Sequence, residues 1–268
     1  MESYQDFAYV YDEFMDETPY EEWCERIDAL IKKYGISKTG RESKSALESE
    51  KNLVVDLGCG TGTLTEMLYK KGYDMIGVDL SQSMLAVAME KKSVSGSDIL
   101  YLMQDMRELE LYSTVGSVVS VCDSINYILE EEELLEVFLR VNNYLYPGGI
   151  FIFDFNTDYK YREIIGDAVI AENRENCSFI WENYFDEETS VNEYDVTIFV
   201  KEEEDVFRKF TETHFQKGYT AKKIKELLEK AGLEVVCMKD SDTENEISDT
   251  SERIYVVAKE VQKKEMEQ

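Results

Sequence analysis

Carboxylates follow four consecutive apolar segments of the chain, and each stands where such a segment ends. These residues are Asp56, Asp79, Asp105 and Asp123. If the segments are parallel strands, their carboxyl ends meet at one edge of a sheet, and the four carboxylates gather above one crevice. Carboxylates there accept hydrogen bonds from hydroxyls or amines, or they balance a cation. Because the five cysteines are scattered and His214 is the single histidine, we expect no metal site.

The first carboxylate opens a glycine-rich turn, Asp56-Leu57-Gly58-Cys59-Gly60-Thr61-Gly62. Glycines allow a tight turn, and we expect the amides of Cys59 and Gly60 to meet a carboxylate or phosphate. Asp56 either contacts that ligand or only caps the turn. A dinucleotide fingerprint has glycine at its sixth position, where this chain has Thr63, so a nicotinamide-dependent dehydrogenase is a weak alternative.

The next two carboxylates suit a nucleoside. Asp79 follows Gly58 at about 20 residues, the separation at which an acid accepts both hydroxyls of a ribose. Asp105, at the end of the following strand, is placed to accept from the exocyclic amine of an adenine. His214 is a candidate general base, although its place among alternating strand residues also fits a structural role.

Strands and helices alternate in the segments that carry these residues. The expected strands cover residues 53–57, 73–78, 99–103, 115–122 and 150–155, followed by 233–238 and 253–258. The alternation predicts an α/β fold, a doubly wound, mostly parallel seven-stranded sheet with helices on both faces. Because no helix separates the last two strands, we expect the last strand to run antiparallel.

Two further segments flank this domain. A helix is expected over residues 19–35, with Thr18 as its N-cap and Gly35 at its end, and residues 37–52 read as a polar connector. After residue 168, strands at 179–185, 191–200 and 206–215 predict an antiparallel insertion. The expected organisation is an N-terminal helical segment or lid (1–35), a main domain (50–165 and 217–260) and a β insertion (168–215).

These residues resemble the class I S-adenosylmethionine-dependent methyltransferases. The resemblance implies a Rossmann-like fold with a reversed seventh strand and S-adenosylmethionine as the cofactor. In that family the glycine turn holds the methionine part, an acid holds the ribose, a further segment lies at the adenine edge, and the fourth motif lies near the transferring methyl group. The cofactor-binding residues it implies are Asp56, Gly58, Cys59, Gly60, Asp79, Leu80, Gln104, Asp105, Met106 and Asp123.

A narrower resemblance is to the bacterial small-molecule branch of this family, which includes sugar-amine N,N-dimethyltransferases. Residues 7–23 and 122–127 and the strand insertion carry it. It implies that Tyr4 and Tyr11 lie over the cofactor and that the insertion walls the acceptor site. Asn126 and Tyr127 would face the methyl group, and with His214 they are the candidate catalytic residues.

Charge separates the remaining functions. Fifty-seven acidic against 29 basic residues give a net charge of −28, which repels phosphate backbones and argues against a nucleic-acid partner. The chain also lacks the Asn/Asp-Pro-Pro-Tyr/Phe motif of base-amino methyltransferases, at Asp123-Ser124-Ile125-Asn126. We find neither a signal peptide nor an apolar run of about 20 residues, so we expect a cytoplasmic protein without a membrane partner.

The sequence therefore predicts methyl transfer to a small-molecule acceptor. An amine is the first choice, because an acid-rich crevice favours a cation. A hydroxyl acceptor would need a base. The same motifs would also suit a cofactor-binding partner protein without turnover, or a methyltransferase acting on a macromolecule. The oligomeric state stays open.

Overall fold

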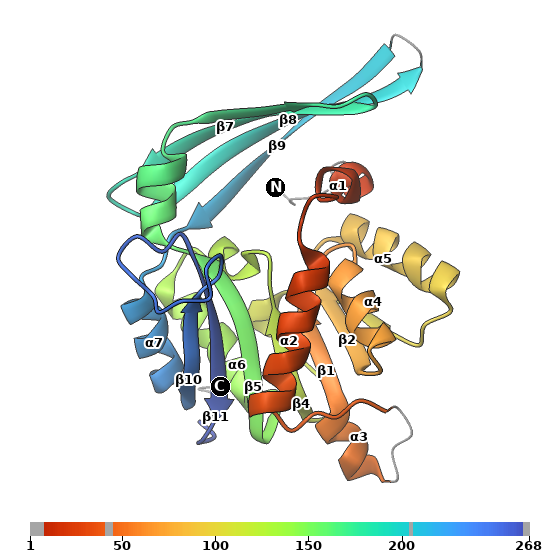
Figure 1. Ribbon diagram of the computed structural model, residues 1–268, viewed down its shortest axis with the longest axis vertical. Helices are drawn as coiled ribbons and strands as arrows, with labels where there is room; N and C mark the ends of the chain where they lie inside the picture. The colour runs from red at the N-terminus through yellow and green to blue at the C-terminus, as the bar shows by residue number, and fades with distance from the viewer. Residues whose placement is uncertain (1–7, 41–44, 204–205, 265–268) are drawn as a thin grey trace.

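The computed structural model describes residues 8–40, 45–203 and 206–264. It contains a seven-stranded sheet and, above its carboxyl edge, a separate four-stranded sheet (Figure 1). The strands of the large sheet are β1 (Leu53–Leu57), β2 (Asp74–Asp79), β3 (Leu100–Met103), β4 (Val115–Ser120), β5 (Leu145–Asn156), β10 (Leu233–Asp240) and β11 (Arg253–Glu260).

The large sheet has the order β10-β11-β5-β4-β1-β2-β3. Neighbouring strands are parallel except at β11, which runs antiparallel to both β5 and β10. The predicted doubly wound sheet with a reversed last strand is confirmed. From β1 the chain adds β2 and β3 on one side and then crosses to β4 on the other side. The carboxyl ends of β1, β2 and β4 therefore border one crevice.

Helices cover both faces of this sheet (Figure 1). Ser81 and Thr220 accept from the amides of Met84 and Lys223 at 3.3 and 3.2 Å and cap α5 and α7. The helices are α1 (Ala8–Phe14), α2 (Tyr20–Tyr34), α3 (Ala46–Asn52), α4 (Thr63–Lys70), α5 (Gln82–Ser95), α6 (Glu131–Tyr144) and α7 (Ala221–Lys230).

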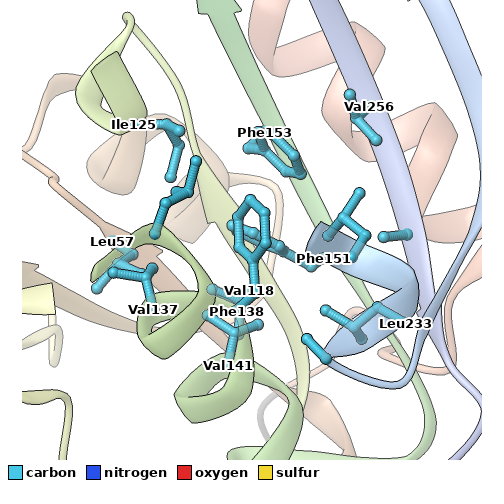
Figure 2. Close-up of a cluster of buried hydrophobic side chains, with 14 of the residues drawn as sticks. Leu57, Val118, Ile125, Val137, Phe138, Val141, Phe151, Phe153, Leu233 and Val256 are labelled. Atoms are coloured by element: carbon cyan, nitrogen blue, oxygen red, sulfur yellow. The ribbon is translucent and has the colours of Figure 1, made fainter. Parts of the chain in front are cut away.

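The core lies on both faces of β5. Figure 2 shows the larger cluster, in which Phe138 of α6 packs on Phe151 and Phe153. The rings of Phe151 and Phe153 stack at 4.6 Å between centroids, and all three side chains are fully buried. On the other face, α2 and α4 bury a second cluster. This apolar burial fixes the sheet that carries the carboxylates.

Four local expectations were wrong. Pro19, not Thr18, occupies the N-cap position of α2. The polar connector contains α3, because Ser45 accepts from the Glu48 amide and starts a helix. Strand β5 begins at Leu145, ahead of the expected start at residue 150.

The fourth difference is the end of β4 at Ser120, two residues early. Cys122 and Asp123 adopt left-handed conformations, with φ of 63° and 53°, so the chain turns sharply there. A short 3-10 helix, η2 (Ser124–Tyr127), follows. This turn decides which side chains after β4 reach the crevice.

The small sheet is the predicted insertion, with one strand more than expected. Its order is β6-β7-β8-β9, and all neighbours are antiparallel. Its strands are β6 (Val169–Asn173), β7 (Cys177–Asp186), β8 (Val191–Glu203) and β9 (Val206–Lys217). In Figure 1 it forms an arm above the large sheet, with α1 beneath it. None of the described helices is long and apolar enough to cross a membrane.

Candidate active site

A cavity of about 340 Å³ opens at the carboxyl ends of the central strands. Its lining includes eleven of the residues expected from the sequence. They are Tyr11, Asp56, Gly58, Cys59, Gly60, Asp79, Leu80, Gln104, Asp105, Met106 and Tyr127. Asp123, Asn126 and His214 lie beyond this lining, and Tyr4 falls outside the described residues. The tertiary structure therefore gathers most of the predicted positions into one place.

The glycine turn is shaped by its neighbours. Gly58 has φ +79°, and a Cβ there would lie 2.6 Å from Ser124 Oγ, so a side chain is excluded twice over. The Cys59 amide donates to Val78 O at 3.0 Å, and the Gly60 amide donates to Asp79 Oδ2 at 2.8 Å. The expectation that these two amides meet a ligand anion directly is therefore wrong for this conformation, because the protein already uses both.

Asp79 is held at the edge of the cavity by backbone donors. Its Oδ2 accepts from Gly60, and its Oδ1 accepts from the Ser81 amide at 2.8 Å. Burial raises the pKa of Asp79, although these amide bonds oppose the rise. The adjacent Leu80 is 61% exposed and lines the same cavity. A fixed carboxylate thus lies next to an apolar wall.

Asp56 lies deeper, at the end of β1. Thr65 Oγ1 of α4 donates to its Oδ2 at 2.6 Å. Burial raises the pKa of Asp56 to about 7, partly offset by that hydrogen bond. Asp56 therefore joins β1 to α4 and also lines the cavity, so both roles weighed for it remain compatible with the geometry.

The segment after β3 forms another wall. Arg107 donates to both carboxylate oxygens of Asp105, through Nε at 3.0 and 3.1 Å and through a terminal nitrogen at 2.6 Å. Burial opposes ionisation of Asp105, but Arg107 outweighs it and lowers the pKa of the carboxyl. Gln104 bonds the backbone of Glu110 through both ends of its amide. Met106 adds an apolar surface to the same wall.

Asp123 points toward the insertion. Gln216 Nε2 of β9 donates to its Oδ2 at 2.6 Å, and Arg253 lies 3.8 Å from its Oδ1. Burial raises the pKa of Asp123, while the charge of Arg253 lowers it. The same guanidinium pairs with Asp154 at 2.7 Å. The left-handed turn thus directs this carboxylate away from the lining.

Asn126 is fully buried, and its amide joins three segments. Its Nδ2 donates to the carbonyls of Asn156 and Lys217 at 2.8 and 2.7 Å, and its Oδ1 accepts from the Asn156 amide at 2.9 Å. The geometry therefore does not support the expected contact between Asn126 and an acceptor. Asn126 instead ties η2 to β5 and β9.

Tyr127, the next residue, does reach the cavity. Its hydroxyl lies 2.8 Å from that of Tyr194 on β8 and 3.2 Å from His214 Nδ1 on β9. The Tyr194 and His214 rings stack at 5.0 Å. His214 Nε2 lies 3.4 Å from Glu212 Oε2. His214 is buried at 1% exposure and connects to the cavity through Tyr127.

Helix α1 covers this side through residues that sequence reasoning missed. Asp12 accepts from Thr61 Oγ1 at 2.6 Å and pairs with Lys91 of α5 at 2.6 Å, and Thr63 Oγ1 also donates to it. Thr61 lies in the glycine turn and Thr63 follows it. These hydroxyls beside the turn were the sequence signal that could have pointed to a contact with α1. Tyr20 and Cys122 also line the cavity, and Tyr11 Oη lies 3.7 Å from Cys122 Sγ.

The cofactor implied by the resemblance fits the residues present. A ribose needs a fixed acceptor for its hydroxyls, and the Asp79 carboxylate is held in place by two amides. A flat base needs apolar surfaces, and Leu80 and Met106, which follow different strands, both line the cavity. A sulfonium is compatible with a lining of three carboxylates, those of Asp56, Asp79 and Asp105, and one guanidinium.

A family model described as a methyltransferase domain matches residues 54–149. A chain from Geobacillus sp. (strain WCH70), whose name places it among the methyltransferases, is 35% identical over 257 residues, 96% of this chain and 99% of that one. The dTDP-3-amino-3,4,6-trideoxy-alpha-D-glucopyranose N,N-dimethyltransferase of Streptomyces venezuelae is 32% identical over 103 residues, 38% of this chain and 42% of its own length.

A solved structure gives the same answer over the whole length. The S-adenosylmethionine-dependent methyltransferase from Clostridium acetobutylicum ATCC 824 is similar at a TM-score of 0.81 and 27% identity, covering 95% of this chain and 98% of that one. Together with the near-complete match to the Geobacillus chain, this shows both the fold and the family. The chain belongs to the S-adenosylmethionine-dependent methyltransferases.

Proposed function

We propose that this enzyme transfers the methyl group of S-adenosylmethionine to the nitrogen of a small-molecule amine. The observation that carries the proposal is the acidic lining of the cavity: among the described residues it has the carboxyl groups of Asp56, Asp79 and Asp105 against one guanidinium, that of Arg107, which is itself paired with Asp105. Such a lining attracts an ammonium. The Streptomyces venezuelae relative, named for an amino-sugar acceptor, points the same way.

The proposed cofactor site consists of Asp79 at the ribose, Leu80, Gln104, Asp105 and Met106 around the adenine, and the glycine turn at the methionine end. When bound, the cofactor supplies a methyl group that is electrophilic without a metal. The chain's own task is to bind both molecules in line and to exclude water. Alignment of this kind can contribute about 7–11 kcal/mol to lowering the barrier.

The size of the acceptor follows from what covers the cavity. Tyr11 of α1 and Tyr127 beneath the insertion both line it, and Asp12 fastens α1 to the glycine turn. The cavity of about 340 Å³ must also hold the cofactor, so the space left beside it favours a small acceptor over a folded macromolecule. The net charge of −28 further disfavours a nucleic acid.

The test is incubation of the full chain with methyl-labelled S-adenosylmethionine and two probes, followed by mass spectrometry. One probe is the amino-sugar nucleotide on which the Streptomyces venezuelae relative is named to act, and the other is a catechol. The expected product is N-methylated sugar with the catechol unchanged. Methylation of the catechol alone would overturn the choice of nitrogen, and transfer only to added RNA or protein would overturn a small-molecule acceptor.

A further inference from the structure

We propose that Glu212, His214 and Tyr127 form a proton relay that takes a proton from the acceptor ammonium at the cavity into the insertion sheet. The inference rests on the proposed amine acceptor. It assigns a function to the insertion beyond walling the site: β9 supplies the final proton acceptor, and η2 supplies the hydroxyl that the acceptor meets.

The three side chains lie one after another from the cavity into the insertion sheet. Tyr127 lines the cavity, and its hydroxyl lies 3.2 Å from His214 Nδ1. The other ring nitrogen, Nε2, lies 3.4 Å from Glu212 Oε2. Tyr194 stacks on the imidazole at 5.0 Å and reaches the Tyr127 hydroxyl at 2.8 Å, which fixes both rings.

The burial of these side chains supports a functional role for them. Glu212, His214 and Tyr194 lie on the face of the insertion that also carries Val196 and Ile198, an apolar cluster against α1. Glu212 is 9% and His214 1% exposed. Burying a carboxylate among apolar side chains is costly unless it faces a partner that carries, or can take up, positive charge. The imidazole Nε2 lies 3.4 Å from Glu212 Oε2, so this carboxylate would stabilise an imidazolium formed at His214.

Nearby titratable groups are consistent with one direction of transfer. The titratable side chains that face the imidazole within the described ranges are Tyr127 from η2, Tyr194 from β8 and Glu212 from its own strand. Glu212 is the carboxyl group among them, so Glu212 supplies the charge that stabilises an imidazolium. A proton that leaves the cavity through Tyr127 therefore moves toward the negative charge of Glu212.

The proton balance is complete without another reactant. The ammonium N–H proton passes to Tyr127 Oη as the Tyr127 proton passes to His214 Nδ1, which leaves a neutral amine, a neutral tyrosine and an imidazolium beside the Glu212 carboxylate. The nitrogen lone pair then forms the new N–C bond as the S–C bond of the sulfonium breaks. After the product leaves, the imidazolium returns its proton through the Tyr127 hydroxyl to water in the open cavity, which resets the relay.

The first experiment uses the fact that the chain has one histidine. Protein labelled with ¹⁵N-histidine gives the tautomer of His214 directly, in the complex with S-adenosylhomocysteine and without turnover. The relay requires Nε2–H facing Glu212 and an unprotonated Nδ1 facing Tyr127. We expect Tyr127→Phe to move the Nδ1 resonance and Glu212→Gln the Nε2 resonance. An imidazole with the proton on Nδ1 would overturn the relay.

The second experiment is the pH dependence of kcat with the amino-sugar nucleotide as the acceptor. Tyr127→Phe and His214→Asn should each lower kcat about 100-fold at neutral pH, the usual size of general-base catalysis. The double variant should be no slower than either single variant, because the residues act as a unit. The deficit should shrink as the pH approaches the pKa of the acceptor ammonium, since a free amine needs no base.

Controls separate this role from a structural one. Glu193→Gln removes a carboxylate from the opposite, exposed face of β8 and should leave kcat unchanged. Affinity for S-adenosylhomocysteine, measured by calorimetry, should be the same in all variants. A deficit independent of pH, or additive in the double variant, would overturn the relay. Absence of N-methylated product from the wild-type enzyme would instead overturn the proposed function, so the two failures are distinguishable.

Discussion

Four carboxylates that look equivalent in the sequence have different surroundings in the structure. Asp79 is held by amides, Asp105 by Arg107, and Asp123 lies near Arg253, while Asp56 accepts from a threonine hydroxyl. A guanidinium or amide favours the ionised form much more than a hydroxyl does. The carboxyl groups at the ends of neighbouring strands therefore differ in how strongly their ionised forms are stabilised, and substitution of single residues can test this difference.

The proposed ribose contact of Asp79 gives the first prediction. Asp79→Asn keeps the shape of the side chain but removes its charge and one of its acceptor oxygens. We expect affinity for S-adenosylhomocysteine to fall about tenfold or more, because charged hydrogen bonds contribute about 1.5–3 kcal/mol. Calorimetry measures it, with Asp186→Asn on an insertion turn as the matched control. Equal affinity in the two variants would contradict the ribose contact.

The buried Asp56 predicts a pH effect on stability. Its pKa is raised to about 7 in the folded protein, so between pH 4 and 7 the folded state holds a proton that the unfolded chain has released. Raising the pH through this window therefore destabilises the folded state. Relative to Asp56→Asn, the wild-type free energy of unfolding should drop by about 3 kcal/mol between pH 5 and pH 8.

Urea unfolding of both proteins at the two pH values measures this difference. Asp56→Asn retains an oxygen that can accept from Thr65, so the comparison isolates the charge. A difference in unfolding free energy that is the same at pH 5 and pH 8 would show that Asp56 ionises normally in the folded protein.

Helix α1 joins the two sheets. Asp12 contacts the glycine turn and Lys91, while on its other side Phe14 packs edge-on against Phe179 of β7, with ring centroids 5.1 Å apart. Arg174 also pairs with Asp16 at 2.9 Å, just after the helix. Only a seven-residue helix is involved, so a few contacts determine whether it stays over the cavity.

Lys91→Met tests this attachment. The pair with Asp12 is partly exposed, so its loss should cost about 1 kcal/mol or less. We expect S-adenosylhomocysteine to dissociate up to about fivefold faster, because α1 opens more often. Stopped-flow displacement measures the rate, and Lys92→Met removes the same charge one residue along α5 as a control. An unchanged rate in Lys91→Met would show that α1 does not limit release.

At the scale of the whole molecule, the excess of negative charge acts on stability as well as on partners. A net charge of −28 repels itself more strongly in the compact state than in the unfolded chain. Added sodium chloride screens this repulsion, with a Debye length of about 10 Å at 0.1 M. We therefore expect the thermal unfolding midpoint to rise between low salt and 0.2 M. A fall over that range, measured by scanning calorimetry, would show that attractive ion pairs dominate.

The sequence by itself determined the sheet and most of the residues that line the crevice at its carboxyl edge. Alternating strands and helices set the doubly wound order, and glycines followed by acids at successive strand ends marked the crevice. These signals are local, since each lies within one element or the turn after it, and parallel strands necessarily bring their carboxyl ends together. The small strand β6 and helix α3 were not predicted, because short, polar or exposed segments show only weak hydrophobic periodicity.

Only the tertiary structure decided which distant residues meet. The left-handed turn after β4 directs Asp123 toward β9, where it contacts Gln216. It also places the side-chain amide of Asn126 in hydrogen bonds between strands and leaves Tyr127 lining the cavity. Likewise, His214 has a path to the cavity because antiparallel pairing sets it beside Tyr194 and over η2. Such partnerships depend on how separate elements pack, and no periodicity within one element encodes them.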